Sequence, residues 1–103
     1  QEMIDLPPEA LEMLRSVFAK HLPCCEVRAF GSRVKGEAKK YSDLDIAVVC
    51  DEPIEKKAFY RLKEEIVELP TSFRVDILDW HKISPEFQSI IEKQYEILYA
   101  KPK

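Results

Sequence analysis

One short segment constrains the fold of this chain more than any other. Gly31 and Ser32 are followed, after ten residues, by Asp43 and Asp45, and an apolar run begins directly after them. Residues two apart on a strand point to the same face, so both carboxylates are expected on one face of a buried strand. The segment therefore predicts a sheet in which a glycine turn and two acids lie close together.

The segments around this motif predict an α/β (α+β) fold, a small mixed sheet of three to four strands covered by helices. The predicted order is α-β-β-α-β-α, and the last helix is expected to continue through Tyr95 and Leu98. A chain of 103 residues is expected to form a single domain, 1–103. In chain order, the predicted elements are a helix from Pro7-Pro8 to Pro23, strands at 25–29 and 44–50, a helix from Pro53 to Pro70, a strand at 73–78 and a helix after Ser84.

A third carboxylate, Asp76, lies in the last predicted strand between Val75 and Ile77. Two carboxylates about 4 Å apart repel by roughly 4 kcal/mol at an effective dielectric near 20, so a set of three calls for a cation. Mg²⁺ takes oxygen ligands and commonly bridges carboxylates to substrate phosphates. We therefore predict Asp43, Asp45 and Asp76 as metal ligands and catalytic residues, with two Mg²⁺ ions serving an in-line displacement.

The turn at Gly31 and Ser32 supplies the other half of the predicted site. Backbone N–H groups in a glycine-containing turn can form an anion-binding nest, and the Ser32 hydroxyl can donate to a phosphate oxygen. Arg33 and Lys35 are predicted to offset the charge of a triphosphate and of leaving pyrophosphate. A solvated loop without a ligand role is an equally open interpretation for these two cations.

Composition narrows the class of protein. The net charge of −3 argues against direct nucleic-acid binding, which depends on cations that neutralise phosphates. No apolar run reaches the length of a membrane span, so no membrane association is expected. Three cysteines, two of them adjacent (Cys24 and Cys25), make a poor disulfide framework, and Cys50 is expected to be a small core residue. A reducing cytoplasm is the expected location.

Gly31-Ser32, ten residues, Asp43-x-Asp45, with Asp76 between apolar residues, resembles the pattern of the DNA polymerase β-like nucleotidyltransferase superfamily. The fuller strings Gly-Ser-Arg-x-x-Gly and Ser-Asp-Leu-Asp-Ile-Ala-Val are similar to its minimal branch, the MntA-type antitoxins that act beside HEPN-domain toxins. The resemblance implies a polymerase β-like core, with Gly31 and Ser32 at the nucleotide phosphates and the three aspartates at Mg²⁺.

The resemblance also implies a reaction and a partner. An enzyme of this branch transfers AMP from ATP to a hydroxyl, expected here to be a tyrosine, on a HEPN toxin, so the chain would be a protein adenylyltransferase and an antitoxin. Larger superfamily members hold the acceptor with an added helical domain, so a partner protein in a hetero-oligomer is expected to complete the site. Two alternatives stay open: an antitoxin that neutralises by binding alone, and a small-molecule, antibiotic-type nucleotidyltransferase.

Overall fold

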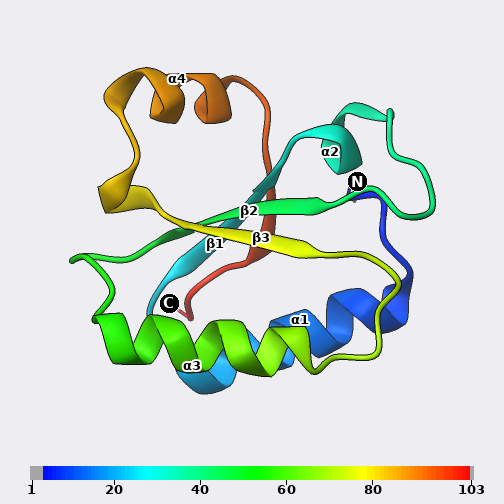
Figure 1. Ribbon diagram of the computed structural model, residues 1–103. Coiled ribbons are helices and arrows are strands. Elements are labelled where there is room, and N and C mark those ends of the chain that lie inside the picture. Colours follow the sequence, from blue (N-terminus) through cyan, green and yellow to red (C-terminus); the bar gives the residue numbers. More distant parts are fainter. Residues whose placement is uncertain (1–3, 103) are drawn as a thin grey trace.

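A four-stranded mixed sheet forms the centre of the molecule, shown in Figure 1. The computed structural model describes residues 4–102. The strand order is β3-β2-β1-β4, with β1 antiparallel to both β2 and β4, and β2 parallel to β3. In chain order, the elements are α1 (Pro8–His21), β1 (Glu26–Phe30), α2 (Ser32–Lys35), β2 (Leu44–Val49), α3 (Lys56–Val67), β3 (Val75–Asp79), the 3-10 helix η1 (Trp80–Lys82), α4 (Pro85–Lys93) and β4 (Glu96–Tyr99).

Helices α1 and α3 lie side by side and cover one face of the sheet (Figure 1). Their apolar stripes pack against strand residues that alternate inward, as expected for a sheet with one buried face. Within the described residues, no helix is both long enough and apolar enough to cross a bilayer. The core of fully buried side chains includes Leu14, Phe18, Val27, Ile46, Val48, Leu62 and Leu98.

The same alternation turns the intervening residues toward the opposite face of the sheet. There Phe30 pairs with Asp45 across the antiparallel β1–β2 ladder, and Asp45 pairs with Asp76 across the parallel β2–β3 ladder. Helix α4 lies on this side (Figure 1), where the Phe87 ring meets the Phe30 ring edge to face at 5.8 Å. The residues of the predicted site therefore cross three adjacent strands on one face.

The predicted mixed sheet covered by helices is confirmed, but the predicted order omits the short helix α2 and the strand β4. The continuation of the last helix through Tyr95 and Leu98 is wrong, because α4 ends at Lys93. The backbone becomes extended at Gln94, with φ −157° and ψ 102°, and β4 then pairs with β1. Tyr95, Ile97 and Tyr99 favour a strand in this segment, and the open edge of β1 provides partners for its backbone groups. These two effects outweigh the helical spacing of the apolar side chains.

The expectation that the cysteines form no disulfide is also wrong. Cys25 and Cys50 are joined, with an S–S distance of 2.05 Å and a Cα–Cα distance of 4.5 Å. They directly flank the paired residues Glu26 and Val49, so the ladder between β1 and β2 brings them opposite each other. Cys24 is exposed and free. The disulfide closes the end of the hairpin that is remote from Gly31.

Candidate active site

The turn after β1 begins at Gly31, whose backbone requires glycine. Its dihedral angles, φ 82° and ψ −155°, lie in a region that side chains with a Cβ rarely enter. A Cβ placed there would lie 2.5 Å from the Asp45 carboxylate oxygen Oδ2, far inside van der Waals contact. The Gly31 carbonyl accepts hydrogen bonds from the N–H groups of Val34 and Lys35, which starts α2. The turn and the Asp45 carboxylate are thus in direct contact.

The three predicted carboxylates occupy neighbouring positions on the face of the sheet that lies opposite α1 and α3 (Figure 1). Asp45 is partly buried in β2, Asp76 is exposed beside it in β3, and Asp43 is exposed just before β2 begins. Burial raises the pKa of Asp45 above its ordinary value, and the negative charges of Asp76 and Asp43 raise that pKa further. Asp45 therefore lies within the electrostatic influence of the other two carboxylates.

The donor set suits Mg²⁺ better than a softer metal, because it offers only carboxylate oxygens. Among the residues that the structure describes, however, no three such side chains lie close enough together to form a ready-made ligand group. The repulsion that raises the pKa of Asp45 is what a bound cation would remove. The chemistry of the three acids fits Mg²⁺, although their side chains are not gathered around one point.

Arg33 is buried and turned toward the protein interior. Its side chain is only 5% exposed, and its guanidinium stacks on the Phe73 ring at 4.6 Å. Every nitrogen of the guanidinium donates to a backbone carbonyl: Nε and Nη2 to Ser42, Nη1 to Asp5, and Nη2 also to Lys39 and Lys40. These contacts hold the loop between α2 and β2 in place and engage the donors that a phosphate would need, so they favour a structural role for Arg33.

Lys35 remains available to a ligand. It is exposed at the end of α2 and lines a hollow that also contains Gly31. Phe30 of β1 and residues of α4 form the other walls of this hollow. The α4 residues include Phe87 and Ile90, which the sequence pattern did not place near the motif. The one signal for them was the extra apolar residue Ile90, which widens the stripe of α4 beyond what the core needs.

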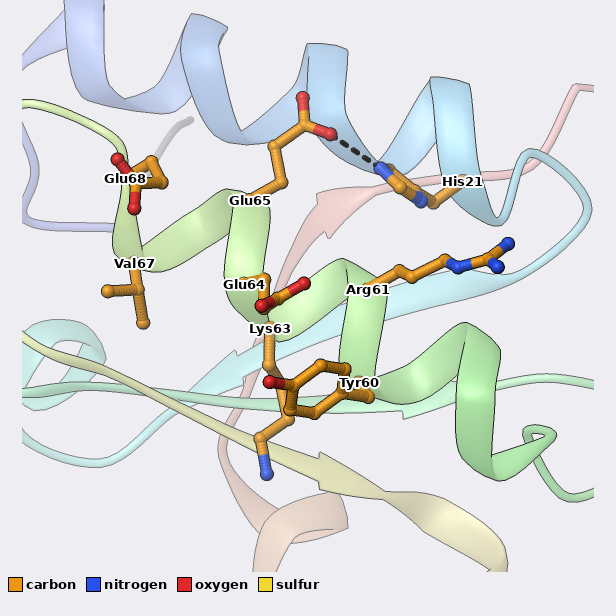
Figure 2. Close-up of a pocket in the computed structure, with 8 residues that line it drawn as sticks. All are labelled: His21, Tyr60, Arg61, Lys63, Glu64, Glu65, Val67 and Glu68. Atoms are coloured by element: carbon orange, nitrogen blue, oxygen red, sulfur yellow. Dashed lines mark hydrogen bonds and ion pairs between the residues drawn. The ribbon is translucent and has the colours of Figure 1, made fainter.

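A second hollow, of about 810 Å³, lies over α3 and the end of α1. Figure 2 shows Glu65 from α3 pointing toward His21 of α1, where the two side chains form a 2.7 Å contact. Tyr60 and Val67 lie on either side of Glu65 along α3. Both Tyr60 and Val67 are exposed, at 62% and 80%. None of the predicted site residues lines this hollow, so its size does not make it the active site.

Comparison with known proteins agrees with this geometry. Residues 12–103 match the family described as "Polymerase beta, Nucleotidyltransferase". The chain belongs to this family. The matched range includes the Gly31 turn and all three carboxylates.

Within the family, one similar protein is the "Probable protein adenylyltransferase MntA" of Haemophilus influenzae. It is 44% identical over 100 residues, which cover 97% of this chain and 88% of that protein. Such identity over nearly the whole of both chains exceeds what a shared fold alone requires. The nucleotidyltransferase family assignment therefore extends to the adenylyltransferase branch.

Solved structures show the same fold. A toxin–antitoxin structure with AMP-PNP matches with a TM-score of 0.73 and 21% identity, covering 92% of this chain and 75% of the other. A complex of a tri-AMPylated Shewanella oneidensis HEPN toxin with an MNT antitoxin matches with a TM-score of 0.69 and 20% identity, covering 90% and 71%. At this level of identity, the likeness supports the polymerase β-like nucleotidyltransferase fold.

Proposed function

We propose that this chain is a Mg²⁺-dependent protein adenylyltransferase that transfers AMP from ATP to a tyrosine hydroxyl of a partner HEPN-domain toxin, and thereby acts as an antitoxin. The observation that carries the proposal is the 44% identity to an adenylyltransferase, combined with a glycine turn that touches Asp45. The related solved structures include a HEPN toxin that carries AMP. The catalytic unit proposed is the whole chain, 1–103, as a single domain.

The proposed site divides the work among its residues. Asp43, Asp45 and Asp76 would hold Mg²⁺, which supplies positive charge against the phosphates and a lowered pKa for an attacking hydroxyl. The Gly31 turn, the Ser32 hydroxyl and the exposed Lys35 would receive the β- and γ-phosphates. Arg33 is assigned to positioning the loop that leads to Asp43.

In the proposed reaction, the acceptor hydroxyl oxygen forms a bond to the α-phosphorus of ATP. The bond from that phosphorus to the oxygen bridging to the β-phosphate breaks, and pyrophosphate leaves beside Ser32 and Lys35. The Asp76 carboxylate, exposed on the edge strand β3, takes the hydroxyl proton. The acceptor therefore approaches from the β3 side, and pyrophosphate departs on the α2 side.

The test is to incubate the protein with ATP, Mg²⁺ and its cognate HEPN-type protein, and to measure the intact mass of that partner. The expected result is a mass increase by one or more AMP units. Asp45→Asn should slow the transfer at least about 100-fold, the scale of losing one group that stabilises developing charge. Asp51→Asn is the matched control, because Asp51 is an exposed carboxylate in the turn after β2 and outside the site.

Two results would contradict the proposal. If no AMP is added and Asp45→Asn neutralises the toxin as well as the wild type does, the chain acts by binding alone. If AMP is transferred to an aminoglycoside and not to the protein, the small-molecule alternative holds.

A further inference from the structure

The hollow between α2 and α4 adjoins the Gly31 turn, and none of the three carboxylates lines it. It has a volume of about 410 Å³, within the range of sites that bury small molecules. Gly31 belongs both to its wall and to the contact with Asp45. A ligand whose phosphates lie on the Gly31 turn therefore has this hollow immediately beside it.

The walls of the hollow suit a flat aromatic group. Phe30 from β1 and Phe87 from α4 meet edge to face at 5.8 Å, and Ile90, 61% exposed, extends the apolar surface along α4. Nucleobases stack on aromatic side chains, and every base can do so because every base has a flat π-face. The Gln94 side chain, which also lines the hollow, offers both a donor and an acceptor to the edge of a base.

The charges at the hollow suit a nucleotide better than they suit a neutral side chain of a partner. Lys35 and Lys93 line it from opposite elements, α2 and α4, and both are exposed. Two cations beside an apolar wall complement a ligand that joins an aromatic ring to phosphates. The proposed reaction also favours this placement. The acceptor oxygen, the α-phosphorus and the leaving pyrophosphate lie on one axis, so the nucleoside must project away from that axis.

We infer that the hollow formed by Phe30, Phe87 and Ile90 holds the nucleoside of the donor ATP, with Lys35 and Lys93 at its charged rim. This inference rests on the proposed use of ATP and extends it by assigning the residues that bind the base and ribose. It makes α4 a specificity element of the site, although none of its residues belongs to the motif that identifies the family.

The experiment measures binding of two ligands to the chain alone, with Mg²⁺ present: AMP-PNP and inorganic tripolyphosphate. Phe87→Ala should weaken AMP-PNP binding roughly tenfold, the loss expected for one stacking contact, and leave tripolyphosphate binding unchanged. Ile90→Trp should act in the same direction by filling the hollow, and its exposure makes misfolding no obstacle. Tyr60→Ala, which removes an exposed aromatic side chain from α3, is the matched control and should change neither affinity.

Two outcomes would overturn the inference: unchanged AMP-PNP binding in both α4 variants, or equal losses for AMP-PNP and tripolyphosphate. If AMP-PNP binding is unchanged and a separate transfer assay of the same variants gives a higher KM for the HEPN partner, the hollow holds the acceptor instead. Since no partner is present in the binding experiment, failure of AMP transfer would leave the binding result intact, so the two proposals fail independently.

Discussion

At the scale of single residues, Gly31 is the position with the least freedom to change. Gly31→Ala should lower the free energy of unfolding by about 1–3 kcal/mol because of its positive φ. It should also abolish nucleotide binding, since the new methyl group would displace the Asp45 carboxylate. Denaturant unfolding and AMP-PNP titration measure the two effects.

Gly36 provides the control for this prediction. It also has a positive φ, 78°, but a Cβ there would meet nothing within 4 Å. Gly36→Ala should therefore cost about 1–2 kcal/mol of stability and leave nucleotide binding intact. Equal loss of binding in both variants would show that the contact with Asp45 is unimportant.

Asp45 predicts a pH dependence of stability. The fold raises the pKa of Asp45, so the native state binds a proton more tightly than the unfolded state does. Its contribution is favourable below the unfolded pKa, near 3.8, and is lost as the pH rises through the higher pKa of the folded state. Asp45→Asn should therefore make the protein more stable at pH 7 while removing activity.

Urea unfolding of wild type and Asp45→Asn from pH 4 to pH 7 measures this effect. The stability gained by the variant should grow with pH across that window. A variant less stable than the wild type at pH 7 without Mg²⁺ would contradict the repulsion described for the three acids.

At the scale of elements, the loop from Gly36 to Asp43 depends on Arg33. Arg33→Lys keeps the positive charge but cannot reach the carbonyls of Asp5, Lys40 and Ser42 together. The lysine would leave partly buried carbonyls without donors and lose the stacking on Phe73, so Arg33→Lys should be destabilised by about 1–3 kcal/mol.

Lys35→Ala is the comparison that separates structure from ligand binding. Lys35 is exposed, so its substitution should change stability by less than about 0.5 kcal/mol but weaken tripolyphosphate binding. Thermal unfolding and ligand titration of both variants distinguish the roles. A fully stable Arg33→Lys with weakened phosphate binding would restore Arg33 as a phosphate ligand.

The β1–β2 hairpin depends on the Cys25–Cys50 disulfide. The bond joins residues 25 positions apart, and a loop of this length corresponds to about 3.5 kcal/mol of stabilisation. Reduction, or a double substitution of both cysteines to serine, should lower the free energy of unfolding by that amount. Cys24→Ser should not change stability, because Cys24 is exposed and free.

At the scale of the whole molecule, local sequence patterns predicted those features that depend on residues close together in the chain. The proximity of Gly31 and Asp45 could be predicted from their spacing along a single hairpin. The side of the sheet on which Asp76 lies could be predicted from the alternation of residues in its own strand. The roles proposed for these residues remain predictions that the experiments above test.

The features that the sequence did not reveal depend on distant partners. Arg33 turns inward because the carbonyl of Asp5 and the ring of Phe73 receive it. Strand β4 forms because β1 has an unpaired edge, and the Cys25–Cys50 bond depends on the register of two strands. Composition and periodicity contain no information about which remote segments meet, so these features required the three-dimensional structure.

The disulfide has a further consequence for the integrity of the chain. The loop between α2 and β2 carries the exposed Lys39 and Lys40, typical targets for a protease at a loop tip. A cut after Lys40 would separate the glycine turn from the three predicted metal-binding acids along the backbone, yet Cys25 and Cys50 lie on opposite sides of that cut. After limited trypsin treatment, a non-reducing gel should therefore show one species of about 12.0 kDa, and a reducing gel two fragments. A nicked molecule would remain one molecule, with both halves of its site still covalently joined.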